Sequence, residues 1–394
     1  MKHSMNRSVY YISLLGLFIL TTSCTNRNYP QPSGMTSTSM ASSNPLVSST
    51  IVPLATDLST VINTPIPSIT PTVLSTTAEP TPTMDSEANQ VRTMLIDQNG
   101  GLWTGGPGGV VHWDIETGTY TTYKAKDGLA SNEVTSIAQT PEGALWFGTF
   151  GAGLSRFDGK TWRTYTIRDG LPGDYILSLA VTPDGILWVD TATKPYKADS
   201  GYAGHIGQFN GEKWHPIVGG GFDSIAASLD GNLWGSTFLQ GLGYFDGQRW
   251  EHLSSDVRVT ALTAAPNGLV WVATPTNIYR VVNSELQEVD PPGLDQADTS
   301  IATIAATANG IVWFGFSSVP PDSLRCGFRD DSIDEWGVYR YDGENWSHFT
   351  KEDGLTDNKI CAIVVGPDDS VWFGTYDNGV SHFDGQAWTT YTIP

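Results

Sequence analysis

Residues 134–166 read VTSIAQTPEGALWFGTFGAGLSRFDGKTWRTYT, and residues 360–392 repeat that plan as ICAIVVGPDDSVWFGTYDNGVSHFDGQAWTTYT. The tryptophan that follows an aliphatic residue in this pattern recurs seven times. Successive copies are 43, 42, 46, 37, 42 and 59 residues apart: Trp103, Trp146, Trp188, Trp234, Trp271, Trp313 and Trp372. Self-similarity at a period of this size is typical of folds in which each repeat is one supersecondary unit. We therefore expect seven such units.

Each repeat contains four short strand candidates separated by turn motifs. In the copy quoted first, residues 134–139 are apolar and small, the next candidate carries Trp146, and the third ends on Phe157. Asp-Gly or Asn-Gly pairs such as Asp158-Gly159 follow, and these pairs supply the positive φ that two-residue hairpins need. Four strands in about 42 residues is the size of a propeller blade. The sequence therefore predicts an all-β fold, a seven-bladed β-propeller with four antiparallel strands per blade.

The tryptophan series is predicted to form core rather than a binding site. Neighbouring blades pack face to face about 10 Å apart, and one large flat side chain per blade fills that gap. The first copy begins with a strand at Val91, and the last ends with one at residues 389–392. We therefore expect every blade to be complete in itself, with no strand shared between the first and the last.

Three motifs resemble the two-component-regulator propeller repeat. They are the Leu-Trp-Phe-Gly-Thr core at residues 145–149, the Gly-Leu-Ser-Arg-Phe-Asp strand at 153–158, and the Asp-Gly-Leu linker at 127–129, 169–171 and 353–355. The resemblance covers residues 91–394. It implies a propeller of the kind that forms periplasmic sensor halves of membrane histidine kinases. Because the chain has no kinase motif, the resemblance implies a stand-alone sensor or binding partner.

The N-terminus has the order of a secretory leader. The basic residues Lys2 and Arg7 precede an apolar stretch at residues 9–20, and small residues then lead to Cys24. Twelve apolar residues are too few to span a bilayer. The end of the segment resembles a bacterial lipobox, although Thr21 stands where that motif usually has Leu. We therefore expect residues 1–24 to be a leader with lipidation at Cys24; the alternative is an ordinary cleaved leader with an incidental cysteine.

Residues 25–88 consist largely of Ser, Thr and Pro. Such a composition buries too little apolar surface to offset the entropy of ordering. We expect a disordered tether there, followed by the propeller over residues 89–394. The protein is thus expected outside the cytoplasm, periplasmic or on the cell surface, held at the membrane by the lipid.

The net charge of −20 argues against a nucleic-acid partner, because phosphate binding needs clusters of Lys and Arg. No Cys or His spacing matches a zinc site. We expect no metal and no cofactor. The acidic residues 329–335 could hold Ca²⁺, but they match no EF-hand loop, and a solvated loop is the simpler interpretation.

Variable loops are expected to concentrate on one face of the propeller. Insertions at residues 194–204 and 317–335 both fall between the second and third strands of a repeat. Loop variation on one face of a rigid scaffold commonly carries function; neutral drift is the alternative. Candidate ligand-binding residues on this side lie at the end of the second strand or on the inner strand: Phe150, Phe238, Tyr376, Arg92 and Asp223. The three aromatic residues could instead cap the core.

A catalytic cluster is not evident. General acid–base chemistry needs titratable side chains that converge on one place, and the inner strands supply few. Asp190 and His205 flank one insertion and form the candidate catalytic pair; the alternative is that they are incidental. The remaining histidines of the repeats are expected mainly on the surface. Cys326 and Cys361 could pair outside the cytoplasm, or both could remain free.

These observations favour binding over catalysis. We expect a monomeric, membrane-anchored sensor or binding module whose variable face takes a small molecule, a glycan or a protein. One alternative is an enzyme that resembles streptogramin lyases, which share Trp-containing propeller repeats and use His, acidic groups and Mg²⁺. The other alternative is a scaffold for protein–protein interaction.

Overall fold

The computed structural model describes residues 90–194, 204–217, 224–237, 241–255, 257–275, 277–292, 300–317 and 336–392. These residues belong to one compact unit, Thr77–Pro394. The predicted leader (1–24, with Cys24) and tether (25–88) lie outside the described residues. So do Asp223, Phe238, Cys326 and most of both insertions.

The described residues form seven four-stranded antiparallel sheets. Blade 1 contains β1 (Thr93–Ile96), β2 (Leu102–Gly106), β3 (Gly109–Asp114) and β4 (Thr119–Tyr123). Blade 2 contains β5 (Val134–Gln139), β6 (Leu145–Thr149), β7 (Leu154–Phe157) and β8 (Trp162–Tyr165). Blade 3 contains β9 (Tyr175–Val181), β10 (Leu187–Ala192), β11 (Gly204–Phe209) and β12 (Trp214–Ile217). Blade 4 contains β13 (Ser224–Ala227), β14 (Leu233–Thr237), β15 (Gly241–Phe245) and β16 (Trp250–Ser254).

The remaining three blades follow the same order. Blade 5 contains β17 (Ala261–Ala264), β18 (Val270–Ala273), β19 (Ile278–Val282) and β20 (Glu285–Val289). Blade 6 contains β21 (Ser300–Ala306), β22 (Val312–Ser317), β23 (Val338–Tyr341) and β24 (Trp346–Phe349). Blade 7 contains β25 (Ile360–Val365), β26 (Val371–Thr375), β27 (Val380–Phe383) and β28 (Trp388–Tyr391). The predicted seven-bladed propeller with complete blades is confirmed.

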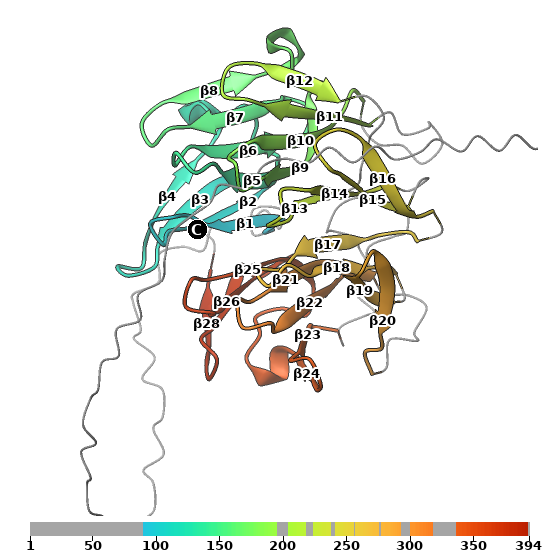
Figure 1. The fold of residues 1–394 in the computed structure, drawn as a ribbon. Helices are drawn as coiled ribbons and strands as arrows, with labels where there is room; N and C mark the ends of the chain where they lie inside the picture. The colour runs from blue at the N-terminus through green and yellow to red at the C-terminus, as the bar shows by residue number, and fades with distance from the viewer. Residues whose placement is uncertain are drawn as a thin grey trace, which may run out of the picture. The chain divides into compact units, whose positions relative to one another are not determined.

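The first strand of each blade lies at the axis. β1 contacts β5, β5 contacts β9, and the series continues through β13, β17, β21 and β25 back to β1, so the ring is closed (Figure 1). At the closing joint the N–H of Val91 donates to the carbonyl oxygen of Thr375 at 3.0 Å. Val91 was expected to open the first strand; it instead bonds to blade 7, and the pairing of β1 with β2 begins at Thr93.

Seven hydrophobic clusters hold the described blades together, one at each joint. The joint between blades 2 and 3 packs Trp146 against Phe209 and Trp214, with ring centroids 5.4 and 6.3 Å apart. The side chain of Trp146 is 1% exposed, and the six other tryptophans of the series are buried as well. The predicted role of this series as core is confirmed.

The linker from one blade to the next is more ordered than the expected loop. Three linkers contain a one-turn 3₁₀ helix: η1 (Ala125–Asp127), η2 (Ile167–Asp169) and η3 (Lys351–Asp353). Each is closed by an Asp side chain that accepts from the backbone N–H at its start and by a Gly in left-handed conformation. The leucine after that glycine is buried. The recurring Asp-Gly-Leu motif is therefore structural.

Candidate functional site

A cavity of about 390 Å³ lies on the propeller axis, lined by residues at the start of all seven inner strands. The lining residues come from the beginning and middle of the inner strands and not from their ends, so the cavity lies toward the side where one blade links to the next. That is the side on which variable loops were expected. Its volume falls within the range of small-molecule pockets.

β-Bulges direct one residue into this cavity in each of four blades. In these blades the ladder between the first and second strands skips the second or third residue of the inner strand: Thr135, Leu177, Ala302 and Cys361. All four residues line the cavity. Arg92 and Thr260 hold the equivalent place, since their N–H groups donate to Gly105 and Ala273 just before the ladder begins. A bulge re-aims a side chain, and here it creates a ring of dissimilar residues around the axis.

Arg92 is the only charged side chain among the described residues that line the cavity. Its Nη1 donates to Glu133 Oε2 at 3.1 Å, and its Nη2 donates to Gln90 Oε1 at 3.3 Å. The side chain is 19% exposed, and its Nε is buried without a hydrogen-bond partner. The guanidinium is thus held from the linker side while a buried donor stays unused.

Hydroxyl groups make up much of the remaining polar wall. Thr135 Oγ1 donates to the carbonyl oxygen of Ile176 at 2.8 Å, and Ser178 Oγ accepts from the N–H of Ile225 at 3.4 Å. In contrast, Ser136 Oγ and Thr260 Oγ1 are buried and have no partner in the protein. Neighbouring atoms cover both of these oxygens. The polar character of the wall therefore comes from Arg92 and from hydroxyl side chains such as Thr135 and Ser178.

The aromatic candidates lie near the cavity but do not line it. Phe150 packs edge-on against Tyr175 with centroids 5.0 Å apart, and its N–H donates to the carbonyl oxygen of Glu133. Tyr376 holds the same place in blade 7, where its N–H donates to Lys359 and the ammonium of Lys359 lies 5.9 Å from its ring. Both aromatic side chains are half-buried. A role in ligand stacking stays a prediction.

Asp190 and His205 do not converge. Asp190 is fully buried in β10, where its cross-strand partner in β11 is Ile206. His205 is exposed and pairs with Thr191. Because directly opposed residues share a face of a sheet and successive residues alternate, the Asp190 and His205 side chains lie on opposite faces of blade 3. The catalytic role of this pair stays untested.

Two histidines expected on the surface pack instead on the core. His112 pairs across strands with Trp103 and stacks on it, with centroids 4.1 Å apart, and His382 stacks on Trp372 at 4.0 Å. Burial lowers the pKa of both imidazoles below the ordinary value of 6.5. Asp97 and Asp114 act in the opposite direction on the pKa of His112, as do Asp368 and Asp384 on that of His382. The sequence signal that could have revealed these contacts is the position of each histidine directly opposite a core tryptophan in the paired strands.

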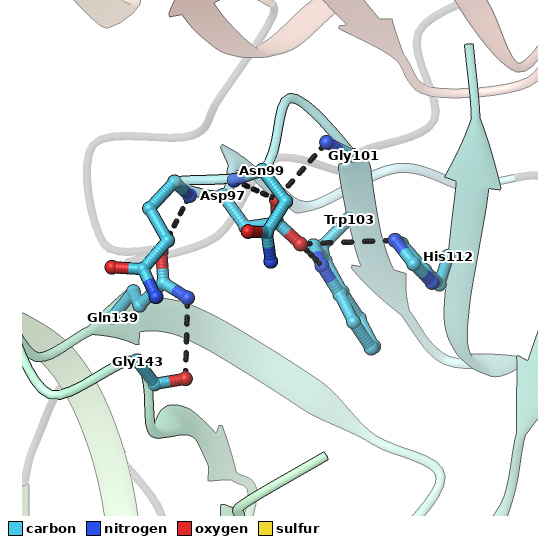
Figure 2. A network of polar contacts seen from close by, with 8 residues as sticks. Asp97, Asn99, Gly101, Trp103, His112, Gln139 and Gly143 are labelled. Atoms are coloured by element: carbon cyan, nitrogen blue, oxygen red, sulfur yellow. Dashed lines mark hydrogen bonds and ion pairs between the residues drawn. The ribbon is translucent and has the colours of Figure 1, made fainter. Parts of the chain in front are cut away.

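Asp97 anchors the turn beside the first of these stacks. Its Oδ1 accepts from the N–H groups of Asn99 and Gly101, and its Oδ2 accepts from Trp103 Nε1 at 2.7 Å. His112 Nε2 lies 3.7 Å from the same oxygen (Figure 2). Blades 2 and 4 use a neutral hydroxyl in this place, since Thr140 and Ser228 accept from their tryptophans. The network therefore serves the core and lies away from the cavity.

The described residues contain no group of three or more His, Cys, Asp or Glu that could hold a metal ion. Within the same ranges, no helix is long and apolar enough to cross a bilayer. Cys361, which faces the cavity, is disulfide-bonded. The other two cysteines, Cys24 and Cys326, lie outside the described residues.

Comparisons with solved structures show the same fold in proteins with different functions. The extracellular domain of a hybrid two-component system of B. thetaiotaomicron aligns with a TM-score of 0.56 and 17% identity over 76% of this chain. This chain spans 39% of that domain's length. A streptogramin B lyase aligns with a TM-score of 0.58 and 15% identity, over 78% of this chain and 95% of the lyase.

A third similar structure is PorZ, a bacterial surface component of the type-IX secretion system of Porphyromonas gingivalis. It aligns with a TM-score of 0.56 and 19% identity, over 75% of this chain and 46% of PorZ. No curated protein sequence matches the chain. The sequence pattern of the two-component regulator propeller matches residues 128–151 and 170–193. Each match begins at the Gly of an Asp-Gly-Leu linker and includes the tryptophan strand of blade 2 or blade 3. The chain is therefore a seven-bladed β-propeller that contains two-component regulator propeller repeats.

Proposed function

We propose that this protein is an extracytoplasmic binding propeller that takes a small polar ligand in its axial cavity. One observation carries the proposal: the axial cavity of about 390 Å³ is walled by a guanidinium, Arg92, and by hydroxyl side chains from several blades, including Thr135, Ser178 and Thr303. These side chains are suited to hydrogen-bond a polar ligand. The repeats and the fold shared with extracellular domains of two-component systems support a role in sensing.

Three observations support a location outside the cytoplasm. The N-terminal sequence has the order of a secretory leader. Cys361 is disulfide-bonded, and disulfides persist mainly in oxidising compartments. The extracellular relatives share the fold. The anchor proposal rests on the lipobox-like end, and it predicts that Cys24→Ser removes fatty-acid labelling and releases the protein from membranes.

The cavity proposal is tested by filling the cavity. Ala302 lies at the bulge position of blade 6, so Ala302→Phe places a ring on the axis. Ligand-observed NMR with a panel of neutral sugars, amino acids and small carboxylates should find binders of wild type that lose at least tenfold affinity in Ala302→Phe. Ala387→Phe makes the same change at an exposed turn and serves as the control. If the binders keep their affinity for Ala302→Phe, the ligand binds outside the axial cavity and the proposal is wrong.

An enzyme of the lyase type is the second candidate, favoured by the fold shared with streptogramin B lyase. The placement of Asp190 and His205 on opposite faces of blade 3 weighs against it. Mg²⁺-dependent opening of a streptogramin B, abolished by His205→Ala, would establish this candidate in place of the first.

A further inference from the structure

The axial cavity of this acidic protein has a positively charged residue in its wall. The chain carries a net charge of −20, yet the charged side chain that the described residues place in the cavity wall is a guanidinium, Arg92. A cationic group is unusual in such a setting unless something anionic meets it. Glu133 does so in part: its Oε2 lies 3.1 Å from Arg92 Nη1, and its side chain is 44% exposed, which weakens the pair through contact with solvent.

We propose that Arg92 anchors the carboxylate of a small organic monoanion in the axial cavity, an inference that rests on the proposed function. A guanidinium presents five N–H donors in a planar fork that matches a carboxylate in two-point contact. The described contacts use one donor toward Glu133 and one toward Gln90. Each Nη carries a second N–H beyond these contacts. A carboxylate that accepts from those two N–H groups would complete a two-point contact and keep the linker contacts.

The other wall residues limit the charge and suggest the rest of the ligand. No second cation lines the cavity among the described residues. A polyanion such as phosphate would therefore meet one guanidinium, already shared with Glu133, inside an acidic protein. Thr135 and Ser178 add neutral hydroxyl side chains to the wall, whereas Leu177, Ala302 and other residues add apolar surface. A single carboxylate on a small, partly apolar, partly hydroxylated body fits this mixture better than a polyanion or an unsubstituted neutral sugar.

Matched acids and amides provide the test. The probes are lactate with lactamide and benzoate with benzamide, together with inorganic phosphate and glucose, titrated by calorimetry at fixed ionic strength. At least one acid should bind wild type at least tenfold more tightly than its amide. Arg92→Gln should abolish that preference, and Arg92→Lys should restore part of it, because the ammonium keeps the charge but loses the fork. Arg168→Gln, at an exposed arginine, is the matched control.

Glu133→Gln separates anion anchoring from a structural role of Arg92. Removing the competing carboxylate should raise affinity for the acid severalfold, whereas an arginine needed only for packing would give no gain. Equal binding of acid and amide, or acid binding unchanged in Arg92→Gln at an unchanged Tm, overturns the inference.

The outcomes distinguish the inference from the proposed function. Suppose that glucose or the amides bind wild type, that their affinity falls in Ala302→Phe and that it is unchanged in Arg92→Gln. The cavity is then a binding site, but not one for anions. If the affinity for the acids falls in Arg92→Gln but is unchanged in Ala302→Phe, Arg92 binds them outside the cavity and the proposed function fails. If no probe binds, both fall for these ligand classes.

Discussion

The joints between blades and the axial cavity are built from the same repeat, but they use it in opposite ways. Each joint receives a buried tryptophan from the same strand position, and the surrounding aliphatic and aromatic residues are similar in all seven blades. The bulge position of the inner strand instead holds Arg, Thr, Leu, Thr, Ala and Cys in the six blades where it is described. The tryptophan position is the same in every repeat and specifies the fold. The bulge position differs from repeat to repeat, so ligand recognition can evolve there without a loss of the fold.

Truncation at a joint should have the largest effect. Trp146→Ala removes a side chain that is 1% exposed and packed against two aromatic rings of blade 3. We expect a loss of about 3–5 kcal/mol in the free energy of unfolding, typical of large-to-small core changes. Urea unfolding followed by tryptophan fluorescence measures it, with the exposed Thr164→Ala as control. A loss near 1 kcal/mol would mean that the joints are not the source of stability.

The turn that anchors Trp103 should come next. Asp97→Ala leaves two backbone N–H groups and one indole N–H without their acceptor, and we expect a loss of about 2 kcal/mol because hydrogen bonds to charged groups are the stronger ones. Thr140→Ala makes the equivalent change in blade 2, where a neutral hydroxyl accepts from Trp146, and should cost about 1 kcal/mol. Equal losses in the two variants would show that the charge of Asp97 adds nothing.

Acidification should weaken the two joints that flank blade 1. The pKa values of His112 and His382 are lowered in the folded protein, mainly by burial. Their contribution to stability is therefore complete above the ordinary pKa of 6.5 and is lost as the pH falls below it, since the unfolded chain takes up protons first.

The measurement is urea unfolding between pH 7.5 and 5.0. The double variant His112→Gln/His382→Gln should show a shallower decline than wild type. His215→Gln/His252→Gln changes two exposed histidines and should decline like wild type. Parallel declines in all three proteins would assign the acid sensitivity to the carboxylates instead.

The cavity wall should be the most tolerant region. Thr260→Val removes a buried hydroxyl that has no protein partner. We therefore expect the free energy of unfolding to fall by less than about 0.5 kcal/mol or to rise. Thr135→Val is the matched control at the bulge of blade 2; its hydroxyl donates to Ile176, and its loss should cost about 1 kcal/mol. Thermal unfolding of both variants checks the difference, and a larger loss for Thr260→Val would contradict it.

Much of the fold could be predicted because it depends on local, repeated chemistry. Seven tryptophans and the Asp-Gly turns fixed the number of blades and the strand order. The closing joint was predicted only in part, because the bond between Val91 and Thr375 joins residues 284 positions apart and leaves no local pattern.

The site was less predictable because it depends on register. Arg92 could be placed on an inner strand from its position, but bulges at Thr135 and Cys361 are set by backbone pairing rather than by composition. The same limit applied to His112, whose contact with Trp103 follows from the cross-strand alignment of β2 and β3. Asp190 and His205 looked adjacent because they flank one loop; the alternation of side chains separates them.

The route by which the chain enters the propeller has a mechanical consequence. Residue 90 leads directly into β1, an inner strand, and Gln90 itself is buried and bonded to Arg92. Tension applied through the preceding residues therefore loads the wall of the axial cavity before it reaches any outer strand. In a propeller pulled from its N-terminus, the residues that bear the force are therefore the same residues that line the candidate binding site. A ligand held by Arg92 would be expected to raise the force needed to detach this strand.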